Sequence, residues 1–140
     1  MIWLLALTLA VDLAAADLAK VRQEPKLDKR SDLALEYAGK AVSAARDAYQ
    51  QGRWTETQES LLEVQAAVGL SYESLLATGK NPRKSSAPFK RAEKAIRELI
   101  RRLGGLRDTM SSVDHPAVDP VLANVSEVHN NLLTGIMTGK

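Results

Sequence analysis

Apolar residues recur at helical spacing in four stretches of the chain, and Gly, Pro and Ser separate these stretches. The first runs roughly over residues 31–51. Its apolar positions are three or four residues apart, which is the spacing of one face of a helix: Leu35, Ala38, Val42, Ala45 and Tyr49. Six alanines in this stretch favour a helix that allows a close neighbour. Gly52 is placed to end it.

The second stretch runs roughly from Trp54 to Thr78, and Gly79 follows it. The residues that predict its apolar face are Trp54, Leu61, Val64, Val68, Tyr72 and Leu75. Near its start, Thr55 and Gln58 have the spacing of a capping box. Residues 80–86 are basic and contain a proline, so we expect a loop there.

The third stretch has the most regular pattern. Its apolar positions alternate three and four residues apart without interruption: Phe89, Ala92, Ile96, Leu99, Leu103, Leu106 and Met110. Gly104 and Gly105 lie inside this seam, and together they cost a helix roughly 2 kcal/mol relative to alanine. Because the seam continues past them in register, we expect a continuous helix; the alternative is a helix that ends at Leu103.

The fourth stretch begins at Asp119-Pro120, a favourable N-cap followed by proline at the first helical position. It continues to about Met137, and its apolar positions are Val121, Val125, Val128, Leu132 and Ile136. The connection before it, residues 113–119, holds Pro116, and we expect His115 to lie in a turn there.

The expected fold class is all-α, because no alternating pattern of useful length predicts a strand. Short connections make neighbouring helices antiparallel. The prediction is an antiparallel four-helix bundle over residues 31–140. It consists of two helical hairpins, 31–79 and 87–138, joined by the basic linker 80–86, and a charged leader segment, 17–30, precedes it.

The N-terminus resembles a secretory signal peptide. Residues 2–11 are an apolar run, and Ala14-x-Ala16 follows as a small-residue cleavage site. The run is shorter than the ~20 residues of a membrane-spanning helix. We therefore expect residues 1–16 to be removed, which leaves no transmembrane span in the mature chain. An uncleaved anchor and a helix docked in the fold are the alternatives.

Residues 41–64 resemble a tetratricopeptide-type helical hairpin. The resemblance rests on the alanines before Tyr49, on Gly52 followed two residues later by Trp54, and on Leu61 and Val64. It implies a shared way of turning between two helices. Thr57 and Leu70 depart from that family's usual Ala and Pro, and no second unit follows.

Few residues in the chain suit catalysis or a cofactor. The absence of cysteine excludes thiolate metal sites, disulfides and a cysteine nucleophile. The spacing of Glu127 and His129 does not match a di-metal carboxylate motif. We expect His129 to be a core-edge residue with one hydrogen bond; a haem or metal ligand, with Met110 or Met137 opposite, is the alternative. We expect no catalytic, cofactor-binding or metal residues and no enzyme activity.

Charge is distributed unevenly along the chain. Residues 80–107 carry 10 basic and 2 acidic groups, whereas the chain as a whole has a net charge of +2. At about 100° per residue, four of the basic side chains form a stripe opposite the apolar seam of the third stretch. These are Lys90, Lys94, Arg97 and Arg101. Lys80, Arg83 and Lys84 extend the stripe through the linker.

A one-sided cationic surface favours an anionic partner. We expect a small exported structural or interaction module, periplasmic or extracellular in a bacterium, whose partner is a protein or an anionic envelope component. We do not expect nucleic acid, because no aromatic residues are interleaved with the basic ones. A cofactor-binding bundle and an envelope chaperone-like bundle are the alternatives. The sequence leaves the oligomeric state open.

Overall fold

A computed structural model of the chain describes residues 17–140, and all of its regular structure is helical. Residues 17–22 form a short helical segment. The elements that follow are α2 (Leu27–Gln50), α3 (Trp54–Ala77), α4 (Ser86–Thr109), the 3₁₀ turn η1 (Ser112–Asp114) and α5 (His115–Thr138). No strand occurs within residues 17–140. The all-α prediction is confirmed, while the predicted signal peptide lies outside the described residues.

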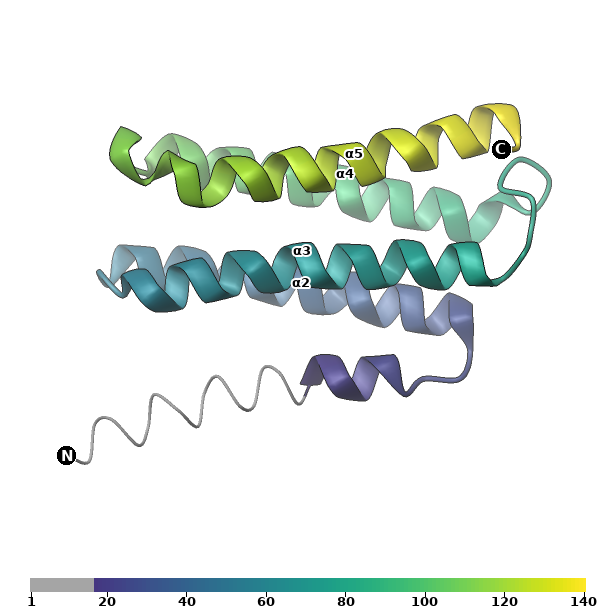
Figure 1. Cartoon of the computed structure of the whole chain (residues 1–140), viewed down its shortest axis with the longest axis horizontal. Coiled ribbons are helices and arrows are strands. Elements are labelled where there is room, and N and C mark those ends of the chain that lie inside the picture. The colour runs from purple at the N-terminus through teal and green to yellow at the C-terminus, as the bar shows by residue number, and fades with distance from the viewer. Residues whose placement is uncertain (1–16) are drawn as a thin grey trace.

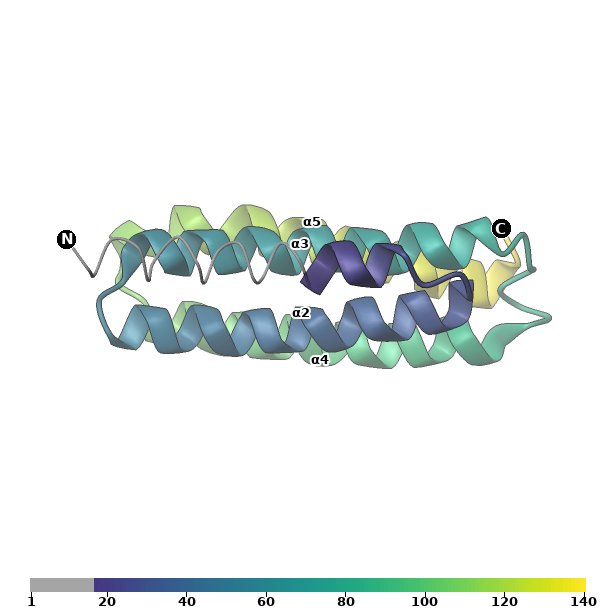
Figure 2. The same cartoon turned by 90° about the horizontal axis from the view of Figure 1, so that it is seen from below.

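The four long helices lie side by side as two hairpins (Figure 1). The α2/α3 hairpin forms one layer and the α4/α5 hairpin packs on one of its faces (Figures 1 and 2). Residues 17–22 lie on the opposite face of α2/α3, where Leu18 and Val21 pack against the core (Figure 2). The α2/α3 hairpin is therefore covered on both sides. Between the two hairpins, α3 packs beside α5 and α2 packs beside α4. α3 and α4 are therefore diagonal to each other.

Glycines end three of the long helices. Gly52, Gly79 and Gly139 adopt φ values of 74°, 67° and 77°, a left-handed conformation that other residues rarely adopt. Gly52 and Gly79 were predicted as helix ends from the sequence, and this is confirmed.

The apolar seam of α4 is buried throughout, as its spacing predicts. The helix runs through Gly104 and Gly105 to Thr109, which excludes the alternative end at Leu103. A Cβ atom added at either glycine would meet no atom within 4 Å. The two glycines therefore weaken α4, and neither is needed to let another part of the chain pack close to the helix.

α2 contributes mainly small residues to the core, whereas α3 also buries large side chains such as Leu61 and Leu75. Buried alanines line α2, namely Ala34, Ala38, Ala41, Ala45 and Ala48. The hydroxyl oxygens of Ser31 and Ser71 are 2.7 Å apart across the interface, a distance that requires the two helix backbones to lie close because both side chains are short. The alanines thus allow the close approach that the sequence predicts.

The predicted start of the last helix is wrong. α5 begins at His115 rather than Pro120, and both Pro116 and Pro120 lie within it. The earlier start buries Val118 completely, one turn before Val121. His115 is therefore not a turn residue: its Nε2 atom is 3.0 Å from the carbonyl oxygen of Arg107, which ties the start of α5 to the end of α4.

Three smaller expectations also fail. The N-cap of α3 is Arg53 with no side-chain cap, so Thr55 and Gln58 form no capping box; instead the hydroxyl of Thr57 donates to the carbonyl oxygen of Arg53. Trp54, assigned to the apolar face, is 37% exposed. α2 begins at Leu27, four residues before the predicted start.

Candidate functional site

The four basic side chains of the predicted stripe, Lys90, Lys94, Arg97 and Arg101, are all exposed on α4. The seam residues on the other side of the same helix are buried. The helical spacing therefore places the stripe on the solvent side, as expected from the sequence.

Ion pairs divide this stripe into two halves. Arg97 lies 3.4 Å from a carboxylate oxygen of Glu93, and Arg101 is paired with Glu98. The hydrogen bond from Arg101 lowers the pKa of Glu98 below its ordinary value. No ion pair within residues 17–140 involves Lys90 or Lys94. The first half of the stripe therefore presents uncompensated charge, whereas the second half is largely neutralised by its own helix.

The basic linker shows the same division. The ammonium of Lys80 is 3.9 Å from a carboxylate oxygen of Asp28 on α2. Arg83 and Lys84 are exposed, and their backbone N–H groups donate to the side-chain oxygen of Asn81 at 2.9 and 3.2 Å. This turn leads directly into α4. The uncompensated cations of the linker therefore adjoin those of the first half of the stripe.

The remaining arginines of α4 hold the helices together. Arg91 is 3.4 Å from a carboxylate oxygen of Asp32, and Arg102 donates to the hydroxyl of Ser43 at 2.7 Å, both on α2. Arg107 donates to Asp119 of α5 at 2.6 Å and lowers the pKa of that carboxyl. These three residues contact the neighbouring helices, and none of them belongs to the stripe that helical spacing predicts.

His129 lies at the edge of the core between α4 and α5. Its Nε2 atom is 3.1 Å from a carboxylate oxygen of Glu93, and the two side chains are 15% and 13% exposed. The expectation of a core-edge histidine with one hydrogen bond is confirmed. Within residues 17–140, no three His, Asp or Glu side chains cluster as metal ligands.

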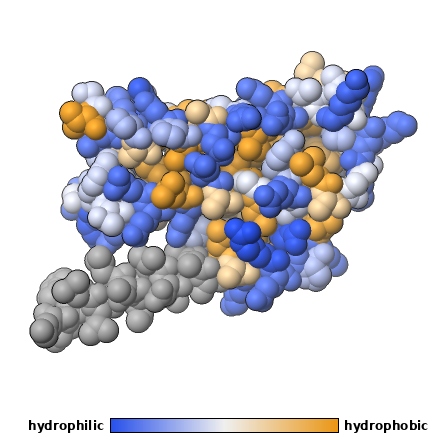
Figure 3. Space-filling view, viewed as in Figure 1, coloured by the Kyte–Doolittle hydropathy of each residue, from blue (hydrophilic) through white to orange (hydrophobic). Residues whose placement is uncertain are grey.

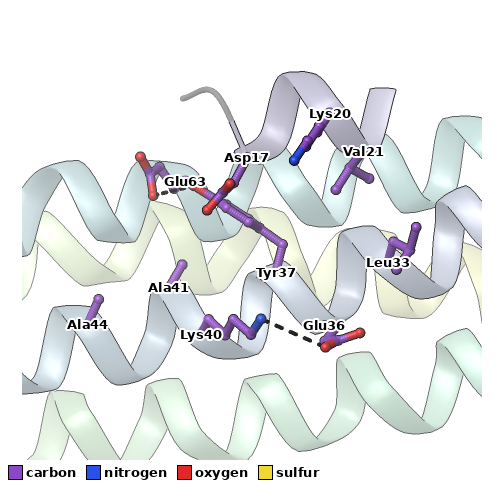
Figure 4. Close-up of a pocket in the computed structure, with 10 residues that line it drawn as sticks. All are labelled: Asp17, Lys20, Val21, Leu33, Glu36, Tyr37, Lys40, Ala41, Ala44 and Glu63. Atoms are coloured by element: carbon purple, nitrogen blue, oxygen red, sulfur yellow. Dashed lines mark hydrogen bonds and ion pairs between the residues drawn. The ribbon is translucent and has the colours of Figure 1, made fainter. Parts of the chain in front are cut away.

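A hollow of about 690 Å³ opens between the segment that starts at Asp17 and the outer face of α2 (Figure 4). Its central side chain is Tyr37, whose hydroxyl donates to a carboxylate oxygen of Glu63 on α3 at 2.8 Å. Burial, and then the neighbouring Glu63, raise the pKa of Tyr37 far above its ordinary value. The phenol therefore stays protonated and acts as a hydrogen-bond donor rather than a base. Sequence reasoning did not predict this hollow, because the leader segment was not expected to pack on α2.

No helix within the described residues combines the length and the apolar character needed to cross a membrane. Comparison of the chain with protein-family models, with curated proteins and with solved structures finds no match.

Proposed function

We propose that this chain is an exported four-helix-bundle module that binds an anionic partner through the basic face of α4. The observation that supports the proposal is the concentration of basic residues in 80–107 together with the free cations at its start, Lys90 and Lys94 on α4 and Arg83 and Lys84 in the linker. Each such residue near an anionic membrane surface contributes about 1 kcal/mol of binding.

The free and paired halves of the stripe have different expected roles. Lys90 and Lys94 are one helical turn apart and have no carboxylate partner within the described chain, so their full charge is available to a partner. Arg97 and Arg101 can offer their full charge to a partner only when their ion pairs with Glu93 and Glu98 break. The affinity therefore depends mainly on the linker and the first turns of α4.

Reversal of charge at the free half tests the proposal. We expect the protein to bind phosphatidylglycerol vesicles at low salt, and to release them as salt rises, because exposed charges are screened within ~8 Å at physiological ionic strength. Lys90→Glu with Lys94→Glu should remove this binding. A soluble polyanion, tested in parallel, separates a lipid surface from a polymer as the source of negative charge.

The matched control is Arg22→Glu with Arg46→Glu, two exposed positions outside α4 that change the net charge by the same amount. This variant should retain most of the binding, and circular dichroism should show that both variants are folded. Equal loss in the two variants would mean that net charge alone drives the attraction, and the proposed face would then be wrong.

Export is the second part of the proposal. Cleavage after Ala16 would leave Leu18 and Val21, which pack on α2/α3, in the mature chain. N-terminal sequencing of protein from the envelope fraction should give Asp17 as the first residue. Intact Met1 in the cytoplasmic fraction would contradict export.

A further inference from the structure

The two helices on one side of the molecule contain no lysine or arginine. These are α3 and α5, 24 residues each, which together contain six acidic residues. In Figure 3, which views this side, hydrophobic residues lie in the open between the polar ones. Long basic side chains commonly cover apolar surface with their methylene stems. Neither α3 nor α5 supplies such stems.

α3 carries a second, solvent-facing seam in addition to the buried apolar one. Its members are spaced four, three, four and three residues apart, which places them on one face of the helix: Leu62, Ala66, Gly69, Glu73 and Leu76. Leu62 is 62% exposed and Leu76 is 54% exposed. A Cβ atom added at Gly69 would meet nothing within 4 Å, so the centre of this seam faces open space. We call these five residues the outer seam.

We propose that the outer seam of α3 pairs with the outer seam of a second copy of this chain, antiparallel about a two-fold axis at Gly69. The order of residues favours this occupant, because Leu62 and Leu76 are each seven positions from Gly69. Antiparallel pairing about Gly69 places the Leu62 of each copy against the Leu76 of the other. A two-fold contact of this kind makes each interaction twice.

The polar residues of this face fit the same pairing. Gln65 and Glu73 are each four positions from Gly69, so pairing places each carboxylate opposite an amide that can donate to it. Parallel pairing would instead place Glu73 against Glu73, which is repulsive. Glu73 is the only charged member of the outer seam itself, so antiparallel pairing brings no two like charges of the seam together.

The absence of a side chain at Gly69 lets two helices approach closely at the crossing point. A contact made by a single helix from each copy is smaller than the interfaces of stable complexes. We therefore expect a dimer that forms and dissociates with concentration rather than a permanent one.

Substitution of Gly69 tests the crossing point. Gly69→Arg should raise the dissociation constant of the dimer at least about tenfold, measured by sedimentation over a wide range of concentration. The monomer should tolerate it, because the position opens to solvent and arginine favours a helix. The matched control is Gly105→Arg on α4, where an added Cβ atom also meets nothing within 4 Å. It should leave the dimer intact.

Cross-linking tests the antiparallel orientation, and the native chain contains no cysteine that would interfere. A mixture of the Leu62→Cys and Leu76→Cys variants, oxidised by glutathione disulfide, should give a covalent dimer that contains one copy of each. Neither variant alone should do so, because positions 14 residues apart are about 21 Å apart along a helix.

Three results would overturn the proposal. The first is a monomer at every concentration, which would leave the outer seam to a different partner. The second is equal association of the Gly69→Arg and Gly105→Arg variants, which would place the contact elsewhere in the chain. The third is efficient cross-linking of the Leu62→Cys variant with itself, which would indicate a parallel arrangement.

Discussion

The two hairpins have the same topology and helix length but are packed in different ways. In the first hairpin, α2 contributes mainly buried alanines, and the hydroxyls of Ser31 on α2 and Ser71 on α3 lie 2.7 Å apart in the interior. The α4/α5 hairpin buries large side chains, among them Phe89, Leu103 and Leu132. The first hairpin thus relies on a close approach at α2 and the second on the burial of large apolar groups, although all four helices are 24 residues long.

This difference determines which substitutions each hairpin tolerates. An interface of large side chains loses most when one of them is truncated, because a cavity remains. An interface of small side chains loses most when one is enlarged, because the helices are forced apart. Truncation of a large side chain therefore tests the packing of the α4/α5 hairpin, and enlargement of a small one tests the packing of the α2/α3 hairpin.

Truncation in the α4/α5 hairpin should have the largest effect. Leu103 is completely buried in the middle of the α4 seam. Leu103→Ala should lower the free energy of unfolding by about 2–5 kcal/mol, measured by urea denaturation. Lys94→Ala, exposed on the same helix, should change it by less than about 0.5 kcal/mol. Equal effects of the two would contradict the assignment of faces on α4.

Enlargement in the α2/α3 hairpin should have the next largest effect. Ala38 is completely buried on α2. Ala38→Leu should cost about 1–3 kcal/mol of stability, because the added methyl and methylene groups have no space between the closely packed helices. The control is Ala44→Leu, at an exposed position of the same helix, which should cost less than about 0.5 kcal/mol. A tolerated Ala38→Leu variant would show that the hairpin is more loosely packed than the Ser31–Ser71 distance indicates.

The smallest effect is a gain in stability at the weak point of α4. Gly104→Ala with Gly105→Ala should raise the free energy of unfolding by up to about 2 kcal/mol, because alanine favours the helix and an added Cβ atom meets no neighbour within 4 Å. Thermal denaturation followed by circular dichroism measures the change. Gly52→Ala is a control for which the opposite effect is expected. It should lower the free energy of unfolding, because the φ of 74° at Gly52 disfavours alanine.

The sequence predicted those parts of the fold that depend on local periodicity. The α4 seam and the helix end at Gly52 follow from spacing and from the conformational freedom of glycine. The start of α5 does not, because Asp119 and Pro120 form a favourable local helix start. The burial of Val118 and the link between His115 and Arg107 are tertiary interactions that a local pattern does not contain.

The candidate site was predictable only in outline. Helical spacing placed Lys90, Lys94, Arg97 and Arg101 on the exposed side of α4. It did not distinguish free from paired charges, because pairing depends on which side chains reach a carboxylate. The outer seam had a signal that sequence reasoning missed: Leu62 and Leu76 lie outside the predicted apolar face of the second stretch, at a multiple of the heptad spacing from each other.

The diagonal placement of α3 and α4 determines how a dimer could meet an anionic partner. Because α3 and α4 lie at opposite corners, a partner on the outer seam of α3 leaves the basic face of α4 open. A dimer formed through α3 would therefore present two basic faces, one from each copy. Because each basic face points away from the contact between the copies, the two faces of the dimer point in opposite directions. The dimer can therefore link two anionic surfaces, or two segments of one long polyanion, but cannot bind one flat surface through both faces.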